Sequence, residues 1–159
     1  MSNLLEVLKN TKLFHLLSES ILEEVAASLT EKKIPKDTLV YRQEVTEMEA
    51  VDIIVSGEYQ TFFFDISENK RCVESMTSNT CFGGISVVLN SVKALKSAWA
   101  KKGTVVYSLP KKDFIELCNS NEEFFHYFTS EFGKKMLNEE YAHFVKSPAS
   151  FEESYFAAD

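Results

Sequence analysis

The spacing of apolar positions divides the chain into a helical beginning, a β-rich middle and a helical end. Near the N-terminus, Leu22, Val25 and Leu29 recur every three or four positions, which predicts a helix. Ser18 or Ser20 stands where a side chain can cap the first turn of that helix. After the first thirty residues the helical spacing ends and short strand-like runs take over.

Short apolar or alternating runs fill the middle of the chain, and each run predicts a β-strand. The runs cover residues 33–36, 38–41, 51–55, 58–65, 71–77, 97–100 and 104–109. Ser56 and Gly57 predict the turn of a hairpin, and residues 67–70 predict a polar loop. The order of elements predicts an α+β fold, in which helices flank an antiparallel, jelly-roll-like β-roll.

The last third of the chain returns to helical spacing. Pro110 ends the last predicted strand and suits the first turn of a helix that passes through Phe114. A longer helix is expected from Asn121, with Phe125 and Phe128 in an apolar stripe that recurs every three or four positions. The first half of this stripe is expected in the core, and the second half is expected to form a partner surface.

These patterns predict four segments within one domain. The N-terminal helices are expected at 1–30, the β-roll at 31–109, the C-terminal hinge helices at 110–146 and a linker-like tail at 147–159. With 159 residues and 45% hydrophobic content, the chain is long enough to bury a core. Thirteen phenylalanines predict that the core is aromatic.

Charge and cysteine content narrow the classes of function. The formal net charge is −7 and no sustained basic run is present, so we expect no nucleic acid partner. No apolar run reaches membrane-spanning length and the N-terminus lacks a signal-peptide pattern, so no membrane association is expected. Cys72, Cys81 and Cys118 are an odd number without a Cys-x-x-Cys pair, which favours a cytoplasmic location over a disulfide framework or a metal site.

A Phe-Gly-Gly turn, Phe82 to Gly84, lies between two β-rich regions and opens onto a short apolar segment. Glycines adopt backbone torsions denied to other residues and let N–H groups approach a ligand. A short helix that begins there directs its first amides and the positive end of its dipole to the same point. The turn therefore predicts a cradle for a phosphate or a carboxylate. The alternative is a tight turn that binds nothing.

Enzyme chemistry has little support in the sequence. Ser86 lacks the second glycine of a nucleophile elbow, which favours a capping or helix-facing role for this serine. His15, His126 and His143 fall in predicted helices, whereas a metal-dependent barrel enzyme needs clustered histidines on its strands. We therefore expect no enzyme activity and no metal.

Several local sequences occur in an order that is typical of one family. They are Lys12 to Leu17, Val40 to Gln43, Ile53 to Glu58, and Leu109 to Leu117. Over about residues 10–135 the chain resembles the cyclic-nucleotide-binding domains of the catabolite-activator and protein-kinase-regulatory superfamily. The resemblance implies a β-roll followed by hinge helices, and a regulatory rather than a catalytic function.

In that family the turn reads Phe-Gly-Glu, and an Arg-Ser/Thr-Ala stretch follows. The resemblance implies that the glutamate binds a ribose hydroxyl and that the arginine pairs with the cyclic phosphate. Here Gly84 replaces the glutamate. Counting forward from Phe82 puts Lys93 at the place of the arginine, whereas the motif Lys96-Ser97-Ala98 puts Lys96 there. The cassette at 82–97 thus offers these expected ligand-binding residues: Phe82, Gly83, Gly84, Ile85, Ser86, Lys93, Lys96 and Ser97.

Two functions from different classes follow from these residues. The first is a regulatory module that binds a small anionic ligand, such as a cyclic nucleotide, and signals through the helix that begins near Asn121. The second is an interaction or dimerisation module that keeps the fold without a ligand. The expected partner is a homodimer through residues 121–146, or further domains after residue 159. No cofactor is expected other than the nucleotide ligand itself.

Overall fold

Two antiparallel sheets form a β-roll in the computed structural model, which describes residues 2–65, 70–88, 92–137 and 145–146. One sheet contains, in spatial order, β1 (Thr30–Lys33), β8 (Val105–Pro110), β3 (Ala50–Ser56) and β6 (Thr80–Phe82). The other contains β2 (Thr38–Tyr41), β7 (Ser97–Ala100), β4 (Tyr59–Asp65), β5 (Lys70–Met76) and β9 (Val145–Lys146). The antiparallel α+β roll predicted from the sequence is confirmed.

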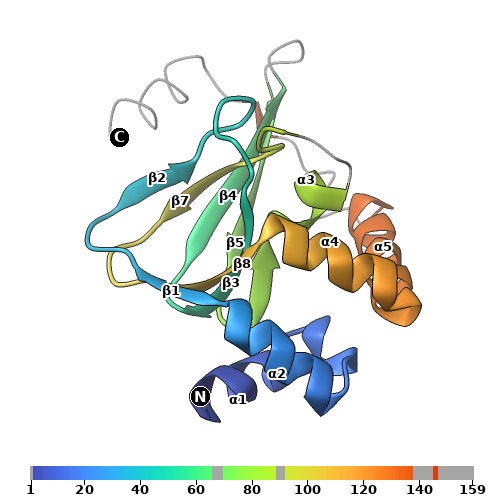
Figure 1. The fold of residues 1–159 in the computed structure, drawn as a ribbon. Helices are drawn as coiled ribbons and strands as arrows, with labels where there is room; N and C mark the ends of the chain where they lie inside the picture. Colours follow the sequence, from blue (N-terminus) through green and yellow to red (C-terminus); the bar gives the residue numbers. More distant parts are fainter. Residues whose placement is uncertain (1, 66–69, 89–91, 138–144, 147–159) are drawn as a thin grey trace.

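Helices precede the roll, interrupt it once and follow it. The helices are α1 (Ser2–Asn10), the 3-10 helix η1 (Phe14–Leu16), α2 (Glu19–Ser28), α3 (Gly84–Val88), α4 (Lys111–Ser120) and α5 (Glu122–Leu137). Of the two serines that could cap α2, Ser18 does so, because its Oγ accepts a hydrogen bond from Ile21 N at 3.4 Å. Figure 1 shows α1 and α2 grouped at one end of the roll, and α4 and α5 packed together at its side.

Three strands differ from the sequence prediction. The strand expected at residues 33–36 instead spans Thr30–Lys33, and Pro35 explains where it ends because proline has no N–H to donate to a ladder. The sequence predicted no strand at β6 (Thr80–Phe82), which pairs with β3. Residues 145 and 146, which the sequence placed among the C-terminal helices, form β9 and pair with β5. The predicted tail at 147–159 lies outside the described residues.

Two hydrophobic clusters form the core. The larger cluster packs α1, α2, α4 and α5 against β3 and β8, and the rings of Phe14, Phe114 and Phe124 meet edge to face within it. The smaller cluster lies inside the roll and includes Tyr59 and Phe82. The aromatic core that the phenylalanine content predicted is therefore present, and it joins the terminal helices to the roll.

The orientation of α5 differs from the one that its apolar spacing suggested. The side chain of Phe124 is 1% exposed, whereas that of Phe125 is 38% exposed. The assignment of Phe125 to the core is therefore wrong. Four aromatic residues crowd positions 124, 125, 127 and 128, so spacing alone does not select a face, and the rings of Phe14 and Phe114 select Phe124. The side chains that follow residue 131 lie outside the described part of the structure.

A buried carboxylate links the two sheets. Asp52 on β3 accepts hydrogen bonds from Tyr41 Oη at 2.9 Å and from Tyr59 Oη at 2.7 Å, and both donors belong to the five-stranded sheet. Ser108 Oγ on β8 donates to its second oxygen at 2.9 Å. Hydrogen bonds to an ionised acceptor are shorter and stronger than neutral ones. Burial, with Asp52 close by, raises the pKa of both tyrosines well above 10.

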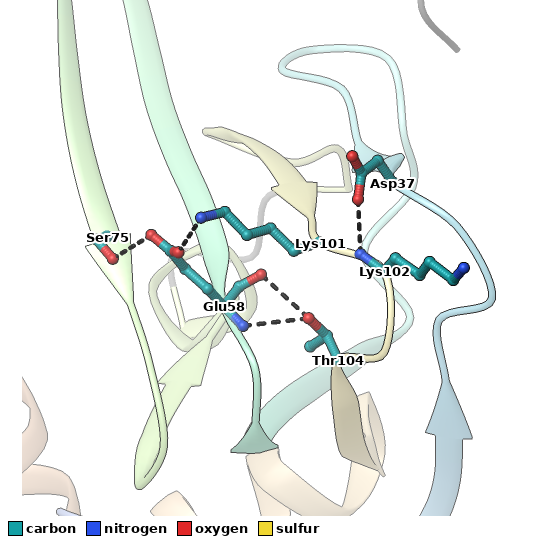
Figure 2. A network of polar contacts seen from close by, with 6 residues as sticks. All are labelled: Asp37, Glu58, Ser75, Lys101, Lys102 and Thr104. Atoms are coloured by element: carbon teal, nitrogen blue, oxygen red, sulfur yellow. Dashed lines mark hydrogen bonds and ion pairs between the residues drawn. The ribbon is translucent and has the colours of Figure 1, made fainter.

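A second polar network holds the turn between β3 and β4 against the loop after β7 (Figure 2). Glu58 pairs with Lys101 at 2.7 Å and accepts a hydrogen bond from Ser75 Oγ. These two hydrogen bonds lower the pKa of the Glu58 carboxyl. Thr104 Oγ1 accepts from Glu58 N at 3.1 Å. Gly57 has φ +90° and packs so closely on Thr104 that a Cβ would collide with it, which explains the glycine in this turn.

Candidate ligand-binding site

The predicted cassette begins where β6 ends. Gly83 has a φ of +101°, which L-residues with a side chain rarely adopt. A Cβ on Gly83 would also lie 2.5 Å from Met48 Cε, so a side chain here would displace the end of Met48, but it is the torsion that requires glycine. The carbonyl oxygen of Gly83 accepts a hydrogen bond from Val87 N at 3.2 Å, which closes the first turn of α3.

Gly84, at the start of α3, is covered by the C-terminal helices. A Cβ on Gly84 would lie 2.9 Å from two ring carbons of Phe128 on α5 and 3.3 Å from Phe114 Cζ on α4. The rings of Phe114 and Phe128 meet edge to face with centroids 5.6 Å apart. The space that a side chain at position 84 would take is thus occupied by an aromatic ring from α5.

The two serines of the cassette hold neighbouring backbone in place. Ser86 is 5% exposed, and its Oγ accepts a hydrogen bond from Leu95 N at 3.2 Å. Ser97 is fully buried, and its Oγ accepts from Gln43 N at 2.9 Å in the segment between β2 and β3. The first bond joins α3 to the residue that precedes Lys96. Both hydroxyls therefore position the rim of the site.

The two lysines that could replace the family arginine lie in different surroundings. Lys93 is exposed, and its backbone forms an isolated antiparallel β-bridge with that of Glu47. Lys96 lies immediately before β7, and its Nζ is 3.7 Å from Glu74 Oε1 on β5. Lys96 therefore lies beside a carboxylate of the five-stranded sheet, whereas Lys93 lies on the exposed segment that pairs with Glu47.

Phe82 is part of the packed interior of the roll. It is 5% exposed, its ring lies 4.9 Å from that of Tyr41, and the ring of Tyr59 meets it edge to face at 5.8 Å. Cys81, the residue before it, is intermediate in exposure as a whole, and burial of its thiol raises the pKa to about 12. Phe82 therefore anchors the glycine turn to the core, while the side chain of Ile85 lies outside the described part.

Three residues that the sequence reading did not select contribute to this region. Met48 closes the space at Gly83, Phe128 covers Gly84, and Glu74 pairs with Lys96. Met48 lies in the loop before β3, Glu74 lies on β5 just ahead of the cassette in the chain, and Phe128 lies on α5, well after it. The aromatic spacing of α5 was the one sequence feature that indicated a packing role for Phe128. No local pattern indicated that Met48 or Glu74 would lie at the cassette.

Two surface hollows lie away from the cassette. One of about 540 Å³ is bordered by Glu6 and Asn10 of α1, by Asn79 and by Tyr107. The other, of about 280 Å³, runs between α2 and α4. Among the described residues, no group of three or more histidines, cysteines and carboxylates is placed to hold a metal ion. Within the same residues no helix is long and apolar enough to cross a membrane.

Solved structures share this fold. The sensor domain of the transcriptional regulator DNR from Pseudomonas aeruginosa is similar at a TM-score of 0.69 and 17% identity, covering 82% of this chain and 87% of that one. The Thermus thermophilus catabolite activator protein is similar at 0.65 and 18% identity, covering 78% of this chain and 57% of that one. The regulatory domain of Toxoplasma gondii PKA, solved with cAMP, is similar at 0.63 and 22%, covering 72% of this chain and 43% of that one.

Comparison of the sequence with family models agrees with the comparison of folds. Among curated protein sequences, none matches the chain significantly. The family model for the cyclic nucleotide-binding domain matches residues 31–121, which is more than half of the chain. That span begins within β1 and ends just after α4, so it contains the whole glycine turn and its bordering strands. With the roll and the turn in place, the chain belongs to the cyclic nucleotide-binding domain family.

Proposed function

We propose that this domain is a regulatory module that senses a small anionic ligand, such as a cyclic nucleotide, and signals through α5. The contact between Gly84 and Phe128 carries the proposal, because it joins the first residue of the cassette helix directly to α5. Interiors are close-packed, so a displaced element forces its neighbours into a second arrangement. A ligand that shifts α3 therefore shifts Phe128.

The movement of α5 would reach the N-terminal segment. The ring of Tyr127 meets the ring of His15 edge to face at 5.8 Å. Lys12 Nζ pairs with Glu131 Oε1 at 3.1 Å. These contacts hold α5 to the segment around η1 while Phe128 holds it to α3. A ligand-driven rotation of α5 thus changes contacts on both sides of the helix, which is what a signalling element requires.

Lys96 is the residue that we assign to the anionic group of the ligand. The bond from Leu95 N to Ser86 Oγ supports this assignment, because it holds the neighbour of Lys96 to α3. Gly84 supplies no acceptor for a ribose hydroxyl, and lysine lacks the two-pronged geometry of arginine. If each lost charged hydrogen bond is worth about 1.5–3 kcal/mol, affinity falls by about a hundredfold or more relative to a complete site. We therefore expect weak binding.

Titration of cyclic AMP and cyclic GMP into the purified protein tests the proposal, with heat release and melting temperature as two readouts. We expect a saturable signal that Lys96→Gln abolishes and that Lys93→Gln leaves in place. Hydrogen exchange in α5 is expected to change on binding in the natural chain and not in Phe128→Ala. The absence of both signals at millimolar nucleotide would exclude cyclic-nucleotide sensing.

A second function, a ligand-free interaction module, is favoured by the position of Phe128 over Gly84 together with the exposed ring of Phe125. Phe128 fills the space that a side chain at position 84 would take, and Phe125 exposes 38% of its surface on the same helix. Sedimentation equilibrium of the natural chain and of Phe125→Ala separates the two functions. Self-association that Phe125→Ala weakens, together with no nucleotide signal, would favour the interaction module.

A further inference from the structure

We propose that Glu74 determines the ligand selectivity of the site by competing with an anionic ligand for Lys96. The proposal rests on the function proposed above and deepens it, because it names the residue that limits anion binding. It follows from the ion pair between Lys96 Nζ and Glu74 Oε1, which are 3.7 Å apart. In this chain the ammonium group that would pair with a phosphate is already paired with a carboxylate of the sheet.

Strand register places this ion pair on the inner face of the five-stranded sheet. Thr61 on β4 is the partner of Ala98 on β7 and also of Glu74 on β5. Side chains that oppose each other in antiparallel strands share a face. Ala98 is fully buried inside the roll, in the same cluster as Phe82. Lys96 lies just before β7, and its Nζ reaches the Glu74 carboxylate on that face.

The ion pair is sheltered enough for its charge to matter. The side chain of Lys96 is 24% exposed and that of Glu74 is 29% exposed, and Glu74 Oε1 itself is buried. Charges that are partly withdrawn from water interact more strongly and are screened less by salt than exposed ones. A bound phosphate would have to replace the carboxylate at Lys96 and would also be repelled by it. Both effects lower the affinity for anions.

The pair also lies within the architecture of the cassette. Leu95, the neighbour of Lys96, donates its N–H to Ser86 of α3. Ala94 belongs to the same buried cluster as Phe82, which ends β6 before the glycine turn. The hydrogen bond between Leu95 and Ser86 therefore holds the start of β7 beside α3, and Lys96 pairs with Glu74 next to that bond. A phosphate docked at the Gly83 turn would approach this same cation.

Glu74→Gln removes the charge and keeps the shape of the side chain. We expect Glu74→Gln to bind cyclic AMP at least tenfold more tightly than the natural chain in calorimetric titration. Inorganic phosphate is expected to gain affinity too, whereas neutral adenosine gains none, because the effect acts through ligand charge. In the double variant Glu74→Gln/Lys96→Gln the gain is lost. Each variant is first compared in melting temperature with the natural chain.

Glu58→Gln is the matched control. Glu58 is also a carboxylate paired with a lysine, Lys101 (Figure 2). Lys101 follows β7, whereas Lys96 precedes it. We expect Glu58→Gln to leave the cyclic AMP affinity unchanged. Glu74→Asp, which keeps the charge, is likewise expected to show no gain.

The outcomes separate this inference from the proposed function. If the natural chain binds nucleotide and Glu74→Gln binds no more tightly, the inference is overturned and sensing stands. If only Glu74→Gln binds, the inference holds and the natural chain is not a cyclic-nucleotide sensor. If neither binds at millimolar nucleotide, both are overturned. An equal gain for adenosine would show that the effect is not one of charge, and would also overturn the inference.

Discussion

Gly84 is the residue at which the cassette and the C-terminal helix meet. It is buried, and the ring of Phe128 stands where its side chain would be. Gly84 is not among the glycines with a positive φ, and the atoms that a Cβ would meet belong to aromatic rings of α4 and α5. At the scale of a single residue, the loss of the family glutamate is therefore matched by the gain of an aromatic contact to α5.

Gly84→Ala is expected to destabilise the protein by about 1–3 kcal/mol, because the new methyl group overpacks against the Phe128 ring. The free energy of unfolding from urea denaturation measures this cost. In a Phe128→Ala background the same substitution is expected to cost clearly less, since the nearer ring is gone and only the contact with Phe114 at 3.3 Å remains. An equal cost in both backgrounds would show that the contact with Phe128 is not the cause.

At the scale of elements, α5 is part of the core of the domain. Phe124 is 1% exposed, and its ring lies 5.6 Å from that of Phe14 and 5.9 Å from that of Phe114. It thereby joins η1, α4 and α5 in one aromatic cluster. The family match ends at residue 121, just before α5 begins. The packing of α5 therefore concerns residues outside the matched segment.

Phe124→Ala is expected to lower the free energy of unfolding by about 3–5 kcal/mol, because it leaves a cavity among buried rings. Phe125→Ala is the matched control on the same turn of the helix, and we expect it to change stability by less than about 0.5 kcal/mol. Chemical denaturation of both variants provides the comparison. Similar losses in the two variants would contradict the orientation of α5 described above.

At the scale of the whole molecule, the network around Asp52 fastens one sheet to the other. Tyr41 and Tyr59 approach from the five-stranded sheet, while Asp52 and Ser108 belong to the four-stranded sheet. The three hydroxyl groups give a buried carboxylate the hydrogen bonds that it needs. The interior of the roll is thus closed by polar as well as apolar contacts.

This network predicts a loss of stability at alkaline pH. The pKa of Tyr41 and of Tyr59 is raised in the folded protein, so both hold their protons while the same residues ionise in the unfolded chain above about pH 10. The contribution of the two tyrosines to stability is therefore full below pH 10 and falls above it, by up to about 1.4 kcal/mol per pH unit for each tyrosine. Cys81, whose pKa is raised from 9.0 to about 12, adds to the slope from about pH 9.

Urea denaturation between pH 8 and pH 11 measures this slope. The double variant Tyr41→Phe/Tyr59→Phe is expected to be less stable than the natural chain at pH 8, because each lost hydrogen bond to a charged group costs about 1.5–3 kcal/mol. Its stability is expected to fall less steeply above pH 10. An identical slope in both proteins would rule out the two tyrosines as its source.

Local pattern was a good guide to some features of this chain and a poor one to others. The glycine turn was predictable because Gly83 adopts a φ of +101° that few other residues tolerate. The face that α5 buries was not, because aromatic residues stand at adjacent positions. The choice between Lys93 and Lys96 was left open by two rival ways of counting from Phe82.

Apolar spacing was enough to predict helices on either side of an antiparallel roll, and the two glycines were enough to predict the turn after Phe82, whereas β6 and β9 were missed. Apolar spacing, glycine and proline act on backbone conformation within a few residues. Their effects can therefore be predicted from the sequence without knowledge of the fold. Only the tertiary structure decided that Phe128 covers Gly84 and that Glu74 faces Lys96. These contacts join distant parts of the chain, and they exist because helix packing and strand register bring those parts together.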